Sequence, residues 1–284
     1  MSLIIYKIVV HHLMKKNTLV ILICFVIIIS LVLISNLFFQ KKEDIKSILS
    51  AKELSKFENF IKQKFEEDVF NGHWKYLRDI TYEYKEGIFE FKQYIKDNKG
   101  RNTTSYEVFQ VKIIASGNQI IFYEFSVQKN KKVKYEWKDS FSWEPYYVSI
   151  EKFKNDEEYK KIKNNFKKIF GSDLNESELF MADIVYGGSC GAGAMYSSER
   201  MQLNSFVDKK DKISILKWLK STNAEKQIYA VEGLLKLKKM GIVLNKTELG
   251  IIKYITHKKG TIKVCNGCIY SSKELSEVIK LFEL

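Results

Sequence analysis

The longest run of hydrophobic positions lies near the start of the chain. Residues 18–39 carry no charge, and 17 of these 22 residues are Leu, Ile, Val or Phe. A helix needs about 20 apolar residues to cross the hydrocarbon layer of a bilayer, where it satisfies its own backbone polar groups. We therefore expect a transmembrane helix over 18–39. The run is longer than the apolar core of a signal peptide, which favours a retained anchor.

The residues on either side of this run do not determine its orientation in the membrane. Residues 1–17 are expected to form a short cytoplasmic tail, and Met14 is an alternative start because two lysines follow it. Three lysines precede the run and five follow it closely, so lysine counts do not favour an outside domain. Long domains are translocated largely regardless of charge. We expect a single-pass protein of a bacterial cell membrane that contacts the bilayer through 18–39, with an extracytoplasmic domain.

Residues 41–153 change from helical to strand-like periodicity. Over 41–70 apolar residues recur three and four positions apart, which predicts a helix. Over 80–153 apolar and polar residues alternate, and turn signals such as Ser116-Gly117-Asn118 separate the runs. Short strands joined by short turns indicate an antiparallel meander. We expect a helix-plus-sheet module whose aromatic residues lie in the core or in cross-strand pairs.

Residues 154–284 are dominated by helix start signals. Asn155 precedes a Lys-rich helical run, and capping-box patterns begin at Thr222, Asn245 and Ser271. Glycines follow several of the apolar runs, where helices commonly end. This part is expected to form a small α-helical module. The whole chain is therefore predicted to be α+β: a transmembrane helix, a helix plus antiparallel meander, and a helical module.

One pair of expected helices carries a family resemblance. Residues 215–219, Ile-Leu-Lys-Trp-Leu, and residues 229–237, Tyr-Ala-Val-Glu-Gly-Leu-Leu-Lys-Leu, lie on consecutive helical runs. The stretch 213–255 that contains them resembles a HEAT-like repeat hairpin. It covers about one repeat, whereas a solenoid needs about three. The resemblance implies an interaction surface and no reaction.

The charge balance is strongly basic but does not indicate a nucleic-acid partner. The formal net charge is +13, and only three of the 47 basic residues are arginine. Arginine is the residue that recognises phosphate and guanine in a bidentate manner. The lysines are better explained as a solvated surface, so no nucleic-acid partner is expected.

A glycine-rich segment matches a hydrolase motif. Gly187-Gly188-Ser189-Cys190-Gly191 fits the nucleophile-elbow pattern G-x-S-x-G, and Asp208 or Asp211 and then His257 follow in the appropriate order. However, that elbow belongs to a β–α–β sheet, and an antiparallel meander precedes it here. We favour a linker or tight turn and keep Ser189 with His257 as a serine hydrolase alternative.

Three cysteines lie outside the apolar run: Cys190, Cys265 and Cys268. The C-x-x-C spacing of the last two is shared by redox dithiols and zinc sites. A zinc site needs a second pair of ligands, which the chain does not clearly offer, so no metal or cofactor is expected. A disulfide from Cys190 to Cys265 or Cys268 is favoured, and a local Cys265–Cys268 disulfide or free or redox-active thiols are the alternatives.

No motif specifies a reaction. The leading prediction is a non-enzymatic, membrane-anchored, extracytoplasmic binding or interaction protein with an unknown protein or small-molecule partner. The alternatives are a thiol-dependent redox protein that uses Cys265 and Cys268, and a serine hydrolase that uses Ser189.

Overall fold

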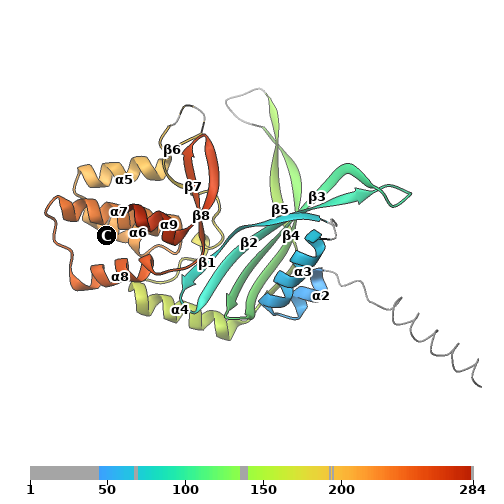
Figure 1. Cartoon of the computed structure of the whole chain (residues 1–284), viewed down its shortest axis with the longest axis horizontal. Coiled ribbons are helices and arrows are strands. Elements are labelled where there is room, and N and C mark those ends of the chain that lie inside the picture. The colour runs from blue at the N-terminus through green and yellow to red at the C-terminus, as the bar shows by residue number, and fades with distance from the viewer. Residues whose placement is uncertain (1–44, 67–69, 135–139, 192, 194, 283–284) are drawn as a thin grey trace, which may run out of the picture. The chain divides into compact units, whose positions relative to one another are not determined.

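A computed structural model describes residues 45–66, 70–134, 140–191, 193 and 195–282 (Figure 1). Within these ranges no helix is long and apolar enough to cross a membrane. This finding lends no support to the predicted single-pass membrane protein, and the span predicted at 18–39 lies outside the described residues. The chain divides into two units, Met1–Ser47 and Ile48–Leu284. The strands that the described residues form all lie in the second unit.

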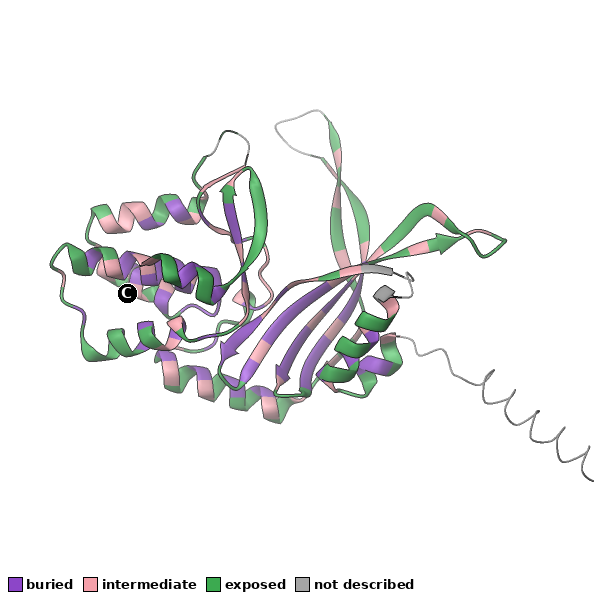
Figure 2. Ribbon diagram, viewed as in Figure 1, coloured by how far each residue is buried: buried purple, intermediate pink, exposed green. Residues whose placement is uncertain are grey.

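Five antiparallel strands form the larger sheet, and their order in the sheet is their order in the chain. These strands are β1 (Phe70–Thr81), β2 (Tyr84–Lys96), β3 (Asn102–Ser116), β4 (Gln119–Lys134) and β5 (Phe141–Lys154). Each strand pairs with the next along the chain. Figure 2 shows buried residues along β2, β3 and β4 near the helices and exposed residues farther out along these strands, whereas β5 contains no buried residue.

The helix expected over 41–70 is two helices, α2 (Ile45–Ser50) and α3 (Leu54–Glu66), followed by a strand. The chain breaks at Lys52, which has a positive φ of 56°. The break is fixed by the β3–β4 turn, because the Leu54 N–H donates to the Asn118 carbonyl and the Ile120 N–H to the Lys52 carbonyl. Pairing with a distant turn therefore ends a helix that periodicity alone would continue.

Aromatic residues on the sheet form much of the core beside α3. The Phe57 ring meets the Trp74 and Phe89 rings edge to face, at centroid separations of 6.0 and 5.8 Å. Phe91, Phe109 and Phe125 stack across neighbouring strands. Such pairs add to the stabilisation that burial provides.

The C-terminal half is not purely helical, contrary to the sequence prediction. Its helices are α4 (Asp156–Phe170), α5 (Ser198–Asp208), α6 (Lys212–Leu219), α7 (Ala224–Lys239), α8 (Lys246–Thr256) and α9 (Leu275–Ile279), with 3-10 turns η1 (Glu176–Glu178) and η2 (Lys280–Phe282). It also contains a second sheet of β6 (Tyr186–Cys190), β7 (Thr261–Gly267) and β8 (Ile269–Glu274). β6 and β7 are parallel, and β7 and β8 form an antiparallel hairpin. Ser271, expected to cap a helix, lies in β8 because it pairs with Val264.

The HEAT-like resemblance of 213–255 is also wrong. Helices α6 and α7 do pack together, but the apolar side of α7 also contacts β6 and β7. Its buried residues belong to the same core as Ile262 of β7 and Leu275 of α9. The helices therefore cover a small sheet within a mixed α+β fold instead of stacking on a further repeat.

Candidate functional sites

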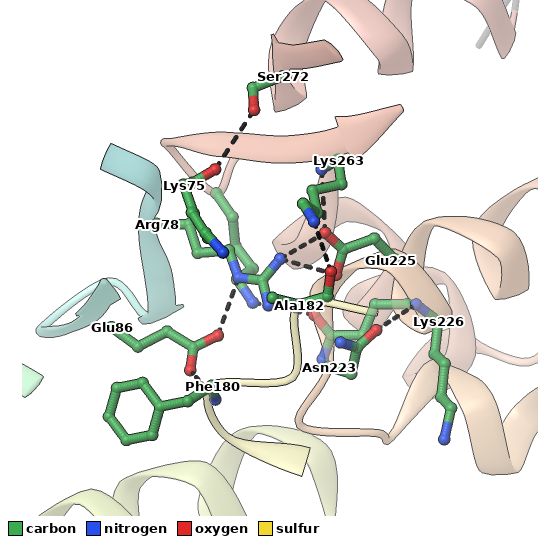
Figure 3. Close-up of polar contacts among 12 residues, drawn as sticks. Lys75, Arg78, Glu86, Phe180, Ala182, Asn223, Glu225, Lys226, Lys263 and Ser272 are labelled. Atoms are coloured by element: carbon green, nitrogen blue, oxygen red, sulfur yellow. Dashed lines mark hydrogen bonds and ion pairs between the residues drawn. The ribbon is translucent and has the colours of Figure 1, made fainter. Parts of the chain in front are cut away.

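A buried ion-pair network joins the five-stranded sheet to helix α7 (Figure 3). The Arg78 side chain on β1 is 1% exposed and lies between two carboxylates. Its Nε donates to Glu86 of β2 at 2.8 Å, and its Nη1 donates to both carboxylate oxygens of Glu225 of α7 at 2.6 and 2.7 Å. Backbone N–H groups also donate to both carboxylates: the Phe180 N–H to the other oxygen of Glu86, and the Lys263 N–H to Oε1 of Glu225, which Arg78 also binds.

This network is structural in character. Burial would lower the pKa of Arg78, but the attraction of Glu225 and Glu86 outweighs it and raises that pKa. Arg78 therefore stays charged at any physiological pH, and none of the three side chains reaches solvent to meet a substrate. The network positions the small sheet and α7 against β1.

A cavity of about 200 Å³ lies where β1 meets the β7–β8 hairpin. Its lining residues are His73, Trp74, Lys75, Val185, Lys263, Val264, Tyr270, Ser271 and Ser272. The lysine charges in it already have partners: the Lys75 ammonium lies 2.6 Å from Glu90, and the Lys263 ammonium donates to the Ala182 carbonyl at 2.6 Å. The cavity therefore lies at the contact between the two sheets, and both of its lysine ammonium groups already bind groups of the protein itself.

The three predicted cysteines come together at one end of the small sheet. Cys190 ends β6, Cys265 lies in β7, and Cys268 lies in the turn that joins β7 to β8. The Cys265 thiol donates to the Ser189 carbonyl at 3.5 Å, and the Cys268 thiol donates to the Gly191 carbonyl at 3.3 Å. All three are free thiols in this structure, so the disulfide stays a prediction.

Cys190 and Cys265 also interact with each other. Burial and the hydrogen bond with Cys265 raise the pKa of Cys190 to about 12. Gly187, paired with Cys265 across the parallel strands, provides the space: a Cβ there would lie 3.1 Å from the Cys190 sulfur and 2.3 Å from the Cys265 carbonyl oxygen. With so high a pKa, the Cys190 thiol is almost fully protonated at neutral pH, so it reacts slowly with disulfides.

The serine hydrolase residues are not brought together. Ser189 lies in β6, which leads into a loop before α5 begins at Ser198, so no sharp strand-to-helix elbow forms. The His257 ring bonds the Lys253 carbonyl at the end of α8, and Asp211 caps α6. Across the described residues no hydrogen bond joins Ser189 to His257. The hydrolase alternative gains no support from this geometry.

Metal binding gains no support from the described side chains either. Within the described ranges no group of three or more His, Cys, Asp or Glu residues could hold a metal ion.

The outer part of the β4–β5 hairpin exposes aromatic residues that sequence analysis assigned to the core or to cross-strand pairs. We call residues 127–134 and 141–150 the β4–β5 arm. On it Phe141, Trp143 and Tyr146 are 57%, 67% and 41% exposed. Lysines of β4 pair with these positions, including Lys132 opposite Trp143 and Lys129 opposite Tyr146. The alternation of apolar and polar residues predicts a strand here, but it does not reveal whether another element covers the apolar side chains.

Comparison with known proteins does not assign the chain to a family. No protein-family model matches the sequence, and no curated protein or solved structure matches it. The function therefore has to be argued from the surfaces and clusters of the chain itself.

Proposed function

We propose that this protein is a binding protein that docks an acidic, partly apolar polypeptide on the β4–β5 arm. The observation that carries the proposal is the exposure of Phe141, Trp143 and Tyr146 on a regular, paired strand. Exposed apolar clusters of this kind mark interaction sites in soluble domains, and aromatic residues dominate the energy of many protein interfaces.

The charge of the arm indicates the chemistry of the partner. The described arm residues include four lysines at 129, 131, 132 and 134 and one acidic residue, Glu144. The Lys132 ammonium lies 4.0 Å from the centre of the Phe141 ring, so positive charge and aromatic surface are interleaved. Complementary charge steers association and fixes the orientation of a partner. An acidic segment with apolar side chains fits this surface.

The base of the arm is anchored to the rest of the sheet. The Tyr147 hydroxyl donates to Glu90 of β2 at 2.5 Å, and the Tyr123 hydroxyl of β4 donates to Glu151 of β5 at 2.5 Å. A surface held in place before binding loses less conformational entropy when a partner docks. β5 is the outer strand of its sheet, but Pro145 lacks the N–H that backbone pairing along its edge would use. Docking through side chains is therefore favoured over addition of a strand.

The test uses a labelled peptide of about 15 residues that alternates glutamate with leucine, and a second peptide with lysine in place of glutamate. We expect saturable binding of the acidic peptide to the full chain by fluorescence anisotropy. Phe141→Ser/Trp143→Ser should weaken that binding at least tenfold, or about 1.4 kcal/mol. The matched control is Tyr196→Ser, since Tyr196 is 56% exposed but lies outside the arm.

Four results would contradict the proposal. Equal binding of both peptides, or unchanged binding by the double variant, would show that the arm does not recognise an acidic partner. Absence of saturable binding would do the same. Self-association that the double variant loses, measured by sedimentation velocity, would make a second copy of the chain the occupant and overturn the acidic partner.

A further inference from the structure

We propose that Cys190 and Cys265 form a reversible disulfide with a small-molecule disulfide, such as glutathione disulfide, as the oxidant. Cys268 stays outside this bond as a free thiol. The site is independent of the β4–β5 arm, so either proposal can fail without the other.

Backbone contacts hold the two thiols in place. The Cys190 N–H donates to the Met195 carbonyl at 2.6 Å, and the Gly191 N–H donates to the Gly267 carbonyl at 2.9 Å. The second bond holds the end of β6 beside the end of β7, and the first holds Cys190 against the chain that follows it. The Cys265 thiol also donates to the carbonyl of Ser189, the residue just before Cys190. The two sulfur atoms therefore need only a local adjustment to bond.

Glycine at 187 allows this approach. A Cβ there would press on the Cys190 sulfur and on the backbone of Cys265 at the same time. Any larger residue would therefore separate the two thiols or the two strands. Cys268 is directed elsewhere: its thiol donates to Gly191, and the residue is exposed.

The disulfide forms by two successive thiol–disulfide exchange steps. One thiol of the pair loses its proton and attacks the oxidant, which gives a mixed disulfide and releases one glutathione thiolate that takes up the proton. The second thiol then loses its proton and attacks the protein sulfur of the mixed disulfide. The Cys190–Cys265 bond forms, and the second glutathione leaves as a thiol. Two protein thiols are oxidised, and one glutathione disulfide is reduced to two thiols.

The bond would close a covalent loop around most of the C-terminal helices. Residues 190 and 265 flank α5, α6, α7 and α8 in the chain. A loop of about 75 residues is long enough for closure to restrict the unfolded chain strongly. Oxidation should therefore stabilise this part of the fold and fasten β6 to β7.

The test is peptide mapping of the full chain after equilibration with reduced and oxidised glutathione. Trypsin places Cys190 in the peptide 169–200 and both Cys265 and Cys268 in the peptide 264–273. We expect these two peptides to be disulfide-linked in the wild type and in Cys268→Ser. The link should be lost in Cys265→Ser and in Cys190→Ser. Fragmentation of the wild-type linked pair should place the bond on Cys265, which keeps the test valid if Cys265→Ser fails to fold.

The stability readout separates the bond from adventitious labelling. Oxidised Cys268→Ser should unfold in urea at a midpoint about 1 M above its reduced form, because a long loop is closed. Cys265→Ser should show no such difference. The proposal is overturned if the linked pair persists in Cys265→Ser, or if the only product of the wild type is glutathione attached to Cys268.

Discussion

Replacing Arg78 by methionine should destabilise the protein more than any surface substitution. Arg78 makes three short hydrogen bonds to Glu86 and Glu225, and all three side chains are at most 2% exposed. Methionine fills much of the same volume but leaves two buried carboxylates, each with one backbone N–H donor. Breaking a buried ion pair in this way costs about 3–5 kcal/mol. We expect the free energy of unfolding to fall by that amount.

The assay is urea unfolding followed by circular dichroism, with the exposed pair of Arg101 and Asp97 as the control. Arg101→Met should cost less than about 1 kcal/mol, because that side chain is 71% exposed. A variant with Met at 78, 86 and 225 should recover much of the loss, because neither carboxylate is then left buried without Arg78. If Arg78→Met lowered the free energy of unfolding by less than about 1 kcal/mol, the two carboxylates would be reaching water, which contradicts their burial without a partner.

Two further predictions concern the same region. Burial and the charge of Arg78 lower the pKa of Lys258 to about 8, whereas the pKa of a lysine in the unfolded chain is near 10.4. Between these two pH values the unfolded chain binds more protons than the folded chain, so Lys258 makes the free energy of unfolding rise with pH. Over pH 8 to 9.5 the free energy of unfolding of the wild type should rise by about 1 kcal/mol per pH unit relative to that of a Lys258→Met variant, and equal pH slopes for the two proteins would contradict this. At Gly260, where φ is 104°, a Cβ would lie 2.3 Å from the Leu77 carbonyl oxygen. Gly260→Ala should therefore lower the free energy of unfolding by at least about 2 kcal/mol more than Gly171→Ala does. Gly171 is the control because its φ is 66° and nothing lies within 4 Å of the position that a Cβ would take there. Equal decreases in melting temperature for the two variants would exclude backbone crowding at Gly260.

Local sequence patterns located several elements of this fold well. The alternation near residues 111–127 lies in β3 and β4, and Asn155 and Asn245 cap α4 and α8. These signals depend on neighbours within about four residues, which the sequence shows directly. The cysteine cluster was partly foreseeable, because Cys190 lies in a glycine-rich segment and Cys265 and Cys268 are three positions apart.

Contacts between distant residues explain what the sequence did not reveal. Thr222 and Glu225 fit a capping box, yet Asn223 caps α7 and Glu225 instead binds Arg78, 147 positions away. No local pattern distinguishes these two roles for a glutamate. Similarly, Trp143 alternates like a core residue, and only the absence of a covering helix among the described residues makes it exposed.

The contact between β1 and the chain just before β7 has a consequence for biosynthesis. Asp79 and Lys259 exchange two hydrogen bonds across 180 residues, and Arg78 forms a bridge with Gly260. At about 5–20 residues per second, ribosomes need roughly 10–35 s to make the intervening segment. Until then β1 has no partner on that side, and Arg78 and Glu225 lack the backbone that encloses them. A nascent chain that ends before residue 259 would therefore leave Asp79 and Arg78 of β1 without these partners. Quality-control proteases could recognise such an incompletely paired strand.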